Sequence, residues 1–300
     1  MDSYAVGVDV GGTKIAAGLV GPDGALVARH TLPTPRDRDA GAVLDAIESA
    51  ARTVAAGHRI AALGVGTGGV VDTATGVIVS ATDLLPPDWV GCRVGPRLRE
   101  RLGVPVAVDN DANALAAGEL AGAGPDTVLY AAIGTGIGGA LVVDGALRHG
   151  RHHTAGGIGH LPVATDSPRR CSCGRPGHLE AVASGPAIAD AYRPGTADLR
   201  AVVAAADAGD DRAAAVLDSA AAVAGRALAG AANLVDPDRV VVGGGVAQIG
   251  PRFLDPLNAA FAAELLPPLG ALRVEPARLG ADASVLGAAA LTTPLIRRNA

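Results

Sequence analysis

The sequence is poor in lysine and in aromatic residues, and each shortage excludes a class of partner. Lys14 is the only lysine among 25 basic residues, and the net charge of −5 comes without a basic block. We therefore expect no nucleic-acid partner. Aromatic residues make up 2% of the chain, with Trp89 as the single tryptophan. This argues against base-stacking platforms and aromatic carbohydrate-binding surfaces.

Long uncharged apolar runs, a leader sequence and a disulfide framework are also missing. The longest apolar stretch, 213–235, contains Asp218 and Arg226, which argues against a membrane span. The sequence reaches Asp9 without a basic and then apolar leader, so we expect no signal peptide. Three cysteines cannot build a disulfide framework. With 49% hydrophobic and 18% charged residues, the chain is expected to be a cytoplasmic α/β-type enzyme with a sizeable core.

Two stretches of the chain share one order of expected elements. Strands are expected at 5–9, 14–20 and 25–31, with a glycine turn after the first and a tight turn after the second. Residues 130–147 repeat this order of strand, glycine turn, strand, tight turn and strand. Two unrelated glycine-rich hairpins would also look alike. Because the same unit opens both expected domains, we favour duplication into two similar α/β domains.

The remaining segments alternate between helical and strand patterns. Helices are expected at 39–57, 91–102, 112–121, 178–192, 198–208, 212–234, 251–265 and 284–295, and further strands at 60–66, 105–108 and 239–242.

Glycine turns follow three expected strands, at 9–14, 134–139 and 243–245. Consecutive backbone N–H groups in such turns can cradle phosphate oxygens, and two threonines add hydroxyl donors. Asp9 can hold Mg²⁺ directly or through water, and Lys14 adds positive charge. A tight hairpin explains each turn equally well, and none is a Walker A loop, but three together favour nucleotide binding. The expected phosphate-binding residues are Asp9, Gly11, Gly12, Thr13, Lys14, Gly134, Thr135, Gly136, Gly138, Gly243, Gly244 and Gly245.

Acidic residues follow the strand expected at 105–108. We expect Asp109 to cap the next helix. Asn110 and Asp111 come at the carboxyl end of this strand, where open α/β sheets bind ligands. A carboxylate there can accept the proton of a substrate hydroxyl as it attacks a γ-phosphate. The sequence thus predicts Asp111 as the catalytic base.

Histidine and cysteine cluster in one stretch, because five of the seven histidines and two of the three cysteines fall between His149 and His178. Two thiolates and two imidazoles suit a closed tetrahedral Zn²⁺ site with a structural role. Free thiols on an exposed loop are the alternative, and the other three histidines of the stretch are expected to be solvated. Cys92 stands apart as an inert thiol. The predicted metal ligands are His160, Cys171, Cys173 and His178.

These features together resemble the ROK family of bacterial sugar kinases, related repressors and N-acylhexosamine kinases. The matching segments follow the family's order over nearly the whole chain: DVGGTK (9–14), VDNDANALAAGE (108–119), IGTGIGG (133–139), GIGHLPV (157–163), CSCGRPGHLEAVASG (171–185) and VVGGGV (241–246). The resemblance implies an α/β chain with an actin-like ATPase (ribonuclease H-like) fold, in which two α/β domains surround a cleft. It also implies a homodimer that binds ATP with Mg²⁺ and a sugar.

The resemblance assigns roles to individual residues. It implies that Asp111 is the catalytic base and also touches the sugar, and that Asn110 binds a sugar hydroxyl. It further implies that His160 both touches the sugar and ligates zinc, and that Glu180 binds the hydroxyls near the anomeric centre. The loop at 66–69, with Gly68 and Gly69, would line the sugar pocket. Attack of the 6-hydroxyl on ATP would then give a sugar 6-phosphate.

The chain departs from the family pattern at two positions and in one loop. Gly157 stands where the family has a glutamate that binds sugar hydroxyls, a loss of about 1.5–3 kcal/mol for a charge-assisted hydrogen bond. His178 replaces the last cysteine of the zinc motif, which zinc tolerates. In the loop over the sugar, Asp83 or Asp88 can offer a carboxylate to an ammonium-bearing sugar.

We expect an N-terminal α/β domain at 1–112, to which a C-terminal helix at 284–296 can be added, and a larger domain at 113–283 with the zinc loop.

The leading function is an ATP-dependent hexose 6-kinase acting on glucose or a close analogue. One alternative is an amino-sugar 6-kinase, acting on kanosamine or an N-acylhexosamine in a biosynthetic pathway. Another is a non-catalytic sugar sensor. A repressor is not expected, because the first strand begins by Tyr4 and leaves no room for a winged helix-turn-helix.

Overall fold

The structure is a computed structural model that describes residues 4–81, 84–121, 124, 126–164, 166, 168–195 and 198–299. The chain divides into two compact units. Unit 1 comprises Met1–Gly122, Gly150–Thr154 and Arg278–Ala300, and unit 2 comprises Ala123–His149 and Ala155–Ala277.

Unit 1 is built on a five-stranded sheet in the order β3-β2-β1-β4-β7. β1 is antiparallel to β2 and β2 to β3, whereas β1, β4 and β7 are parallel. β1 and β2 are buried along nearly their whole length, while β3 alternates between half-buried and exposed residues as an edge strand does. The strands are β1 (Tyr4–Val10), β2 (Lys14–Val20), β3 (Leu26–Pro33), β4 (Ile60–Thr67) and β7 (Val106–Asn110), with a separate hairpin of β5 (Val70–Asp72) and β6 (Val77–Ser80).

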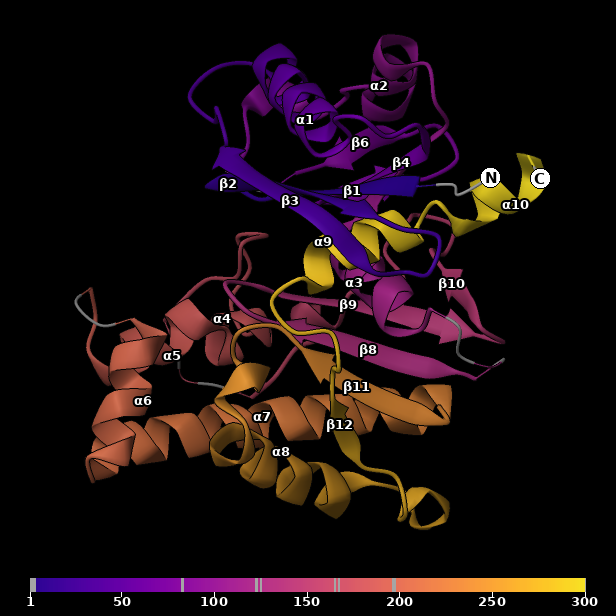
Figure 1. Cartoon of the computed structure of the whole chain (residues 1–300). Coiled ribbons are helices and arrows are strands. Elements are labelled where there is room, and N and C mark those ends of the chain that lie inside the picture. The colour runs from indigo at the N-terminus through magenta and orange to yellow at the C-terminus, as the bar shows by residue number, and fades with distance from the viewer. Residues whose placement is uncertain are drawn as a thin grey trace. The chain divides into compact units, whose positions relative to one another are not determined.

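Helices cover both faces of this sheet (Figure 1). α1 (Ala40–Val54) and α2 (Val94–Leu102) lie on one face, and α3 (Asp111–Glu119) and α9 (Ala283–Ala290) lie on the other. The 3₁₀ turn η1 (Pro87–Trp89) and α10 (Thr293–Asn299) complete the unit. Asp39 caps α1 by accepting a hydrogen bond from the backbone N–H of Ala42.

Glycines let α9 approach the sheet and α3 closely. A Cβ on Gly7 of β1 or Gly64 of β4 would overlap a backbone carbonyl oxygen of α9. A Cβ on Gly118 of α3 would lie 2.7 Å from the Cα of Gly287. All of α3 therefore falls in unit 1, and the domain boundary expected at 112/113 lies inside this helix.

Unit 2 repeats the arrangement of unit 1 in the order β10-β9-β8-β11-β12. β8 is antiparallel to β9 and β9 to β10, and β8, β11 and β12 are parallel. This identical order is what the repeated strand and turn pattern predicts. The strands are β8 (Val128–Ile133), β9 (Ile137–Val143), β10 (Ala146–Arg148), β11 (Arg239–Gly243) and β12 (Val274–Pro276).

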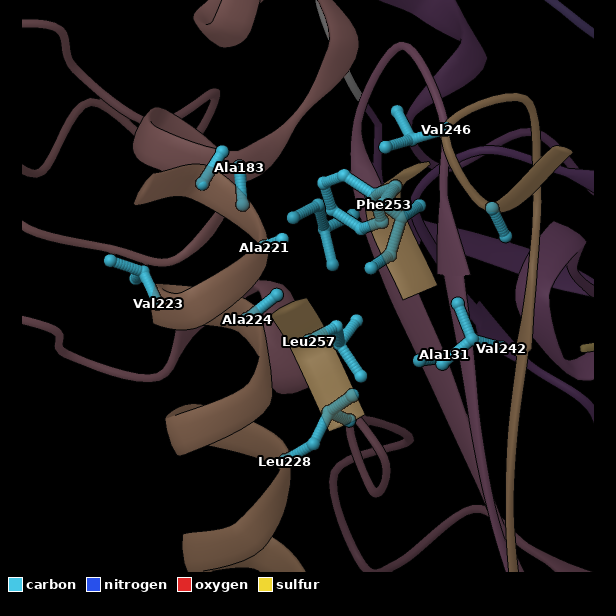
Figure 2. Close-up of a cluster of buried hydrophobic side chains, with 14 of the residues drawn as sticks. Ala131, Ala183, Ala221, Val223, Ala224, Leu228, Val242, Val246, Phe253 and Leu257 are labelled. Carbon is cyan, nitrogen blue, oxygen red and sulfur yellow. The ribbon is translucent and has the colours of Figure 1, made fainter. Parts of the chain in front are cut away.

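The core of unit 2 lies between this sheet and two long helices. Phe253 and Leu257 of α8 meet small residues of α7 and the strand residue Val242 (Figure 2). α7 is long and apolar enough to cross a membrane by length and composition alone, but half of its most apolar window is buried in the unit. The helices are α4 (Glu180–Ala183), α5 (Gly185–Tyr192), α6 (Leu199–Asp207), α7 (Asp211–Val235) and α8 (Pro251–Glu264), with 3₁₀ turns η2 (Ile158–His160), η3 (Ala247–Ile249) and η4 (Pro267–Leu269).

Two helices expected from the sequence are each broken into two. The segment 178–192 forms α4 and α5, because Ser184 is extended and caps α5, and Pro186 enters its first turn. The segment 284–295 forms α9 and α10, with buried Thr292 between them and Pro294 in the first turn of α10. A proline supplies no N–H group to continue a preceding helix.

Candidate functional site

The parallel register of unit 1 brings the acidic strand ends together. Asp9 pairs with Gly66, which in turn pairs with Asp109. Asp111 begins α3 directly after β7, and its charge acts on Asp9. Two carboxylates from segments a hundred residues apart therefore lie near each other at the carboxyl edge of one sheet.

Burial dominates the electrostatics of this carboxylate pair. Desolvation by the surrounding protein raises the pKa of Asp111, although the residue as a whole is exposed. Desolvation also raises the pKa of Asp9, and repulsion from Asp111 adds to the rise, while a hydrogen bond with Ser284 and the charge of Lys14 oppose it. An acid with a raised pKa is suited to accept a proton from a bound hydroxyl.

Asn110 joins this edge to the glycine loop after β4. Its amide nitrogen donates to the carbonyl oxygen of Gly69 at 2.8 Å. Gly69 has a φ of +102°, and a Cβ there would overlap the carbonyl oxygen of Ser80. Gly69 of the predicted sugar loop is thus tied to Asn110, beside Asp111, and Gly68 precedes it in the same loop.

The cap of α3 is Asn110, and the expectation that Asp109 caps this helix is wrong. Asn110 Oδ1 accepts from the N–H of Ala112 at 2.9 Å. Asp109 is buried, and its Oδ1 accepts from Asn110 N at 2.7 Å and Asn113 Nδ2 at 2.8 Å. The helix begins at Asp111, so only the residue before it can cap, and Asp109 instead braces the strand end.

The glycine turn of unit 1 is held by its own backbone and by Thr34. Gly11 N donates to Lys14 O at 3.0 Å, and the Thr34 hydroxyl donates to Gly11 O at 2.6 Å. Thr34 N also donates to Thr13 O. Thr13 and Lys14 are exposed and available to a ligand, and Gly12 lies under Leu84. Thr34 carries no sequence signal of this supporting role.

The two glycine turns of unit 2 lie side by side. Gly134 N donates to Gly136 O at 2.9 Å, and Gly134 O accepts from Gly185 N at the start of α5. A Cβ on Gly134 would lie 3.9 Å from Gly245 N. Gly244 has a φ of +88°, and a Cβ there would overlap the carbonyl oxygen of Ile133. Two of the three predicted phosphate-binding segments therefore form one backbone surface in this unit.

The four predicted metal ligands also meet in unit 2. Their ligand atoms all lie within 4.8 Å of one another. Cys171 Sγ lies 3.3 Å from His160 Nδ1, and Cys173 Sγ lies 3.3 Å from His178 Nδ1. Backbone hydrogen bonds between 161–163 and 177–179 bring His160 next to His178. A set of two sulfurs and two imidazole nitrogens this close together fits a tetrahedral zinc ion.

Cys171 is the one buried side chain of this set. Burial, with a contribution from Glu180, raises the pKa of this thiol to about 11. A neutral thiol is a poor ligand, and a bound cation is what would hold this sulfur as a thiolate at neutral pH.

Glu180, the first residue of α4, has both carboxylate oxygens engaged. Oε2 accepts from Ile137 N at 3.0 Å, and Oε1 accepts from Ser172 N at 3.0 Å and from the Cys171 thiol at 3.2 Å. Burial alone would raise the pKa of Glu180, but the hydrogen bonds from Ser172 and Ile137 outweigh it and lower the pKa. These contacts tie the metal loop to the glycine turn, which the sequence analysis did not anticipate.

Four further residues were singled out in the sequence: Asp83, Asp88, Cys92 and His153. Asp88 accepts from Ala40 N at 3.0 and 3.1 Å and thus supports the start of α1. Asp83 lies outside the described residues. His153, expected to be solvated, is half-buried, with Nε2 3.7 Å from Asp72 Oδ1. Cys92 is buried, which raises the pKa of its thiol.

Comparison with known proteins extends the resemblance to the whole chain. The glucokinase of Halalkalibacterium halodurans is 35% identical, over 95% of this chain and 94% of that protein. The structure of a ROK family glucokinase from Streptomyces griseus in complex with glucose and AMPPNP has a TM-score of 0.83 and 34% identity, covering 99% of this chain and 100% of that one. A ROK hexokinase from Thermus thermophilus gives a TM-score of 0.83 and 37% identity, covering 99% and 100%.

These neighbours confirm the actin-like ATPase fold expected from the sequence. The model of the ROK family matches residues 5–294. A match over nearly the full length, together with paired sheets of identical order, leaves one conclusion: the chain belongs to the ROK family.

Proposed function

We propose that this chain is an ATP-dependent hexose 6-kinase that phosphorylates glucose or a close analogue. The observation that carries the proposal is the placement of Asp111 beside Asp9 at the carboxyl edge of the unit 1 sheet. Similarity to the S. griseus glucokinase, whose structure holds glucose and AMPPNP, supports the choice of substrates.

Asp111 acts as the base in this proposal. Its carboxylate accepts the proton of the sugar 6-hydroxyl as O6 forms a bond to the γ-phosphorus and the bond from that phosphorus to the β,γ-bridging oxygen breaks. The products are a sugar 6-phosphate and ADP. Because this transition state is loose, Asp111 mainly orients the hydroxyl.

The phosphate groups are assigned to the glycine turns. In unit 1, Asp9 would hold the Mg²⁺ that accompanies ATP, and the exposed Thr13 and Lys14 face the same ligand. When bound, this ion neutralises charge on the phosphates. In unit 2, the turns at 134–138 and 243–245 offer backbone N–H groups to an anion.

Sugar contacts are assigned separately in the two units. In unit 1, Asn110 and the loop of Gly68 and Gly69 would meet sugar hydroxyls. In unit 2, His160 and Glu180 are proposed to do so. Asn110 is supported by its bond to Gly69, which holds its side chain in place next to Asp111.

The proposal also includes a structural zinc ion and the cellular setting. His160, Cys171, Cys173 and His178 would hold Zn²⁺, which closes the loop at 171–178 and needs no open position for chemistry. We further propose a cytoplasmic homodimer, as the family resemblance implies.

An ADP-release assay with Mg-ATP tests the function. It compares kcat/KM for glucose, mannose, N-acetylglucosamine, glucosamine and 3-amino-3-deoxyglucose. Glucose in the lead by a wide margin supports the proposal. ATP binding without turnover of any hexose would instead favour a sugar sensor.

One observation favours an amino-sugar kinase as second candidate. Gly157 replaces the glutamate of the family pattern, and it is exposed directly before η2. An amino sugar in the lead in the same assay would support this candidate. Gly157→Glu should then shift the preference towards glucose, by roughly 10-fold or more if one charge-assisted hydrogen bond is restored.

A further inference from the structure

Glu180 bridges the metal loop and the glycine turn through its two carboxylate oxygens. Oε1 faces the backbone N–H of Ser172, which lies between the two cysteine ligands. Oε2 faces the backbone N–H of Ile137, which opens β9 directly after the turn at 134–136. Each side of the bridge is a hydrogen bond of 3.0 Å to backbone.

The turn is shaped to receive this carboxylate. A Cβ on Gly136 would lie 2.7 Å from Glu180 Oε2, so a side chain at 136 would displace the carboxylate. Glycine at 136 thus has a packing reason beyond the turn itself. Glu180 is half-buried and is the first residue of α4.

The metal loop, in turn, fixes where Oε1 must be. Cys171 and Cys173 flank Ser172, and their sulfurs each lie 3.3 Å from a histidine of the cluster. A metal ion held by these side chains would fix the Ser172 N–H from both sides. Because hydrogen bonds to a carboxylate are directional and strong, a fixed Ser172 holds Glu180, and Glu180 holds Ile137.

We propose that Glu180 is a positioning residue for nucleotide binding, through which metal occupancy at His160, Cys171, Cys173 and His178 holds the turn at 134–136 in its anion-binding shape. This inference rests on the proposed function and adds a second role to a residue already assigned to the sugar. It couples a structural metal to nucleotide affinity within unit 2.

The first test measures AMPPNP binding with Mg²⁺ and without sugar. Protein loaded with zinc is compared with protein stripped by a chelator, which is then removed before Mg²⁺ is added back. The dissociation constant of AMPPNP should rise about tenfold on stripping. Equal affinity in the two forms would overturn the proposal.

The second test uses Glu180→Gln, which keeps shape but has only one acceptor oxygen, so one of the two backbone N–H groups loses its partner. Zinc-loaded Glu180→Gln should bind AMPPNP about as weakly as stripped wild type, and stripping it should add little. Suppose instead that stripping and Glu180→Gln each raise the dissociation constant of AMPPNP, and that the two factors multiply in the stripped variant. Glu180 then does not carry the coupling, and the proposal is overturned. Glu275→Gln is the matched control, because Glu275 pairs with Arg239 on the surface of unit 2.

Hydrogen exchange supplies a readout independent of any ligand. Both stripping and Glu180→Gln should speed exchange in the peptide that contains Ile137 while β11 keeps its protection. Unchanged exchange at Ile137 in both cases would contradict the proposed bridge. A wild type that phosphorylates hexoses with metal-independent nucleotide affinity would refute only this inference, whereas absent turnover would refute the proposed function.

Discussion

The two sheets of the molecule have the same strand order and differ in where their charge comes from. Asp9 is the second-last residue of β1 and pairs with Ala16, and the corresponding residue of β8 is Ala132, which pairs with Gly138. The turn of unit 1 is thus flanked by Asp9 and Lys14. The turn of unit 2 has no charged residue of its own and receives a carboxylate, Glu180, from α4.

The same positions also show how each sheet is covered. Gly7 of β1 corresponds to Tyr130 of β8, and Gly64 corresponds to Val241. Unit 1 uses the two glycines to admit the α9 backbone, whereas unit 2 fills the space with side chains. The same strand order is therefore compatible with charged side chains at the glycine turn of unit 1 and with an uncharged glycine turn in unit 2.

The sharpest test of this division is Asp111→Asn. If the proton-accepting charge belongs to unit 1, kcat should fall by about 10²–10⁴-fold, the usual contribution of a general base, while AMPPNP affinity stays within a few-fold. Steady-state kinetics and calorimetry measure the two quantities. Asp144→Asn serves as control, since Asp144 is exposed and has a φ of 54° that asparagine tolerates. A kcat within a few-fold of wild type would remove Asp111 as the base.

In unit 2, Cys171→Ser should weaken zinc binding and should have no direct effect on proton transfer. Loss of a ligand should lower zinc affinity by more than the roughly 10–100-fold that changes around the ligands cause. The melting temperature should fall with the zinc content, which elemental analysis measures. Cys92→Ser should keep its zinc, because Cys92 lies outside the cluster. Full zinc in Cys171→Ser would refute the site.

Because α9 packs directly against the backbone of the unit 1 sheet, Gly7→Ala should lower the free energy of unfolding. The new Cβ would overlap a carbonyl oxygen of α9, a backbone atom that cannot turn aside, so we expect a loss of about 1–3 kcal/mol or more in the free energy of unfolding. Urea unfolding measures it. Gly230→Ala in α7 is the matched control, because nothing lies within 4 Å of the added Cβ, and it should stabilise by about 0.5–1 kcal/mol. Equal stability of the two variants would contradict the close packing of α9.

The smallest expected effect is on pH dependence. Burial raises the pKa of Asp9 and Asp111 above the ordinary 3.8, so kcat/KM should fall as pH drops through the raised pKa of Asp111. The stability effect has the opposite sign: between 3.8 and the raised pKa the unfolded chain binds fewer protons, and the free energy of unfolding declines as pH rises. Asp111→Asn should flatten that decline in urea titrations at several pH values. An unchanged slope would mean that Asp111 titrates alike in both states.

Local pattern was enough to predict most of the strands, the glycine turns and the gathering of cysteine and histidine in one loop, but not β5, β6 or β12. Strand alternation, glycine clusters and the short spacing from Cys171 to His178 all report geometry within a few residues. The position of Asp111 could also be predicted from local sequence, because this residue directly follows a strand. Asp109 shows the limit, because the pattern did not give the exact start of α3, and the helix begins at Asp111 with Asn110 as its cap.

The sequence by itself determined the repeated fold and the residue types of the site, because periodicity and spacing act along the chain. Only the tertiary structure decided that Thr34 braces the first turn, that α9 docks on Gly7, and that Glu180 joins Ser172 to Ile137. All but the contact between Glu180 and Ser172 join residues more than twenty positions apart, and burial decides which polar groups must find such partners. Their geometry exists only once the elements have packed.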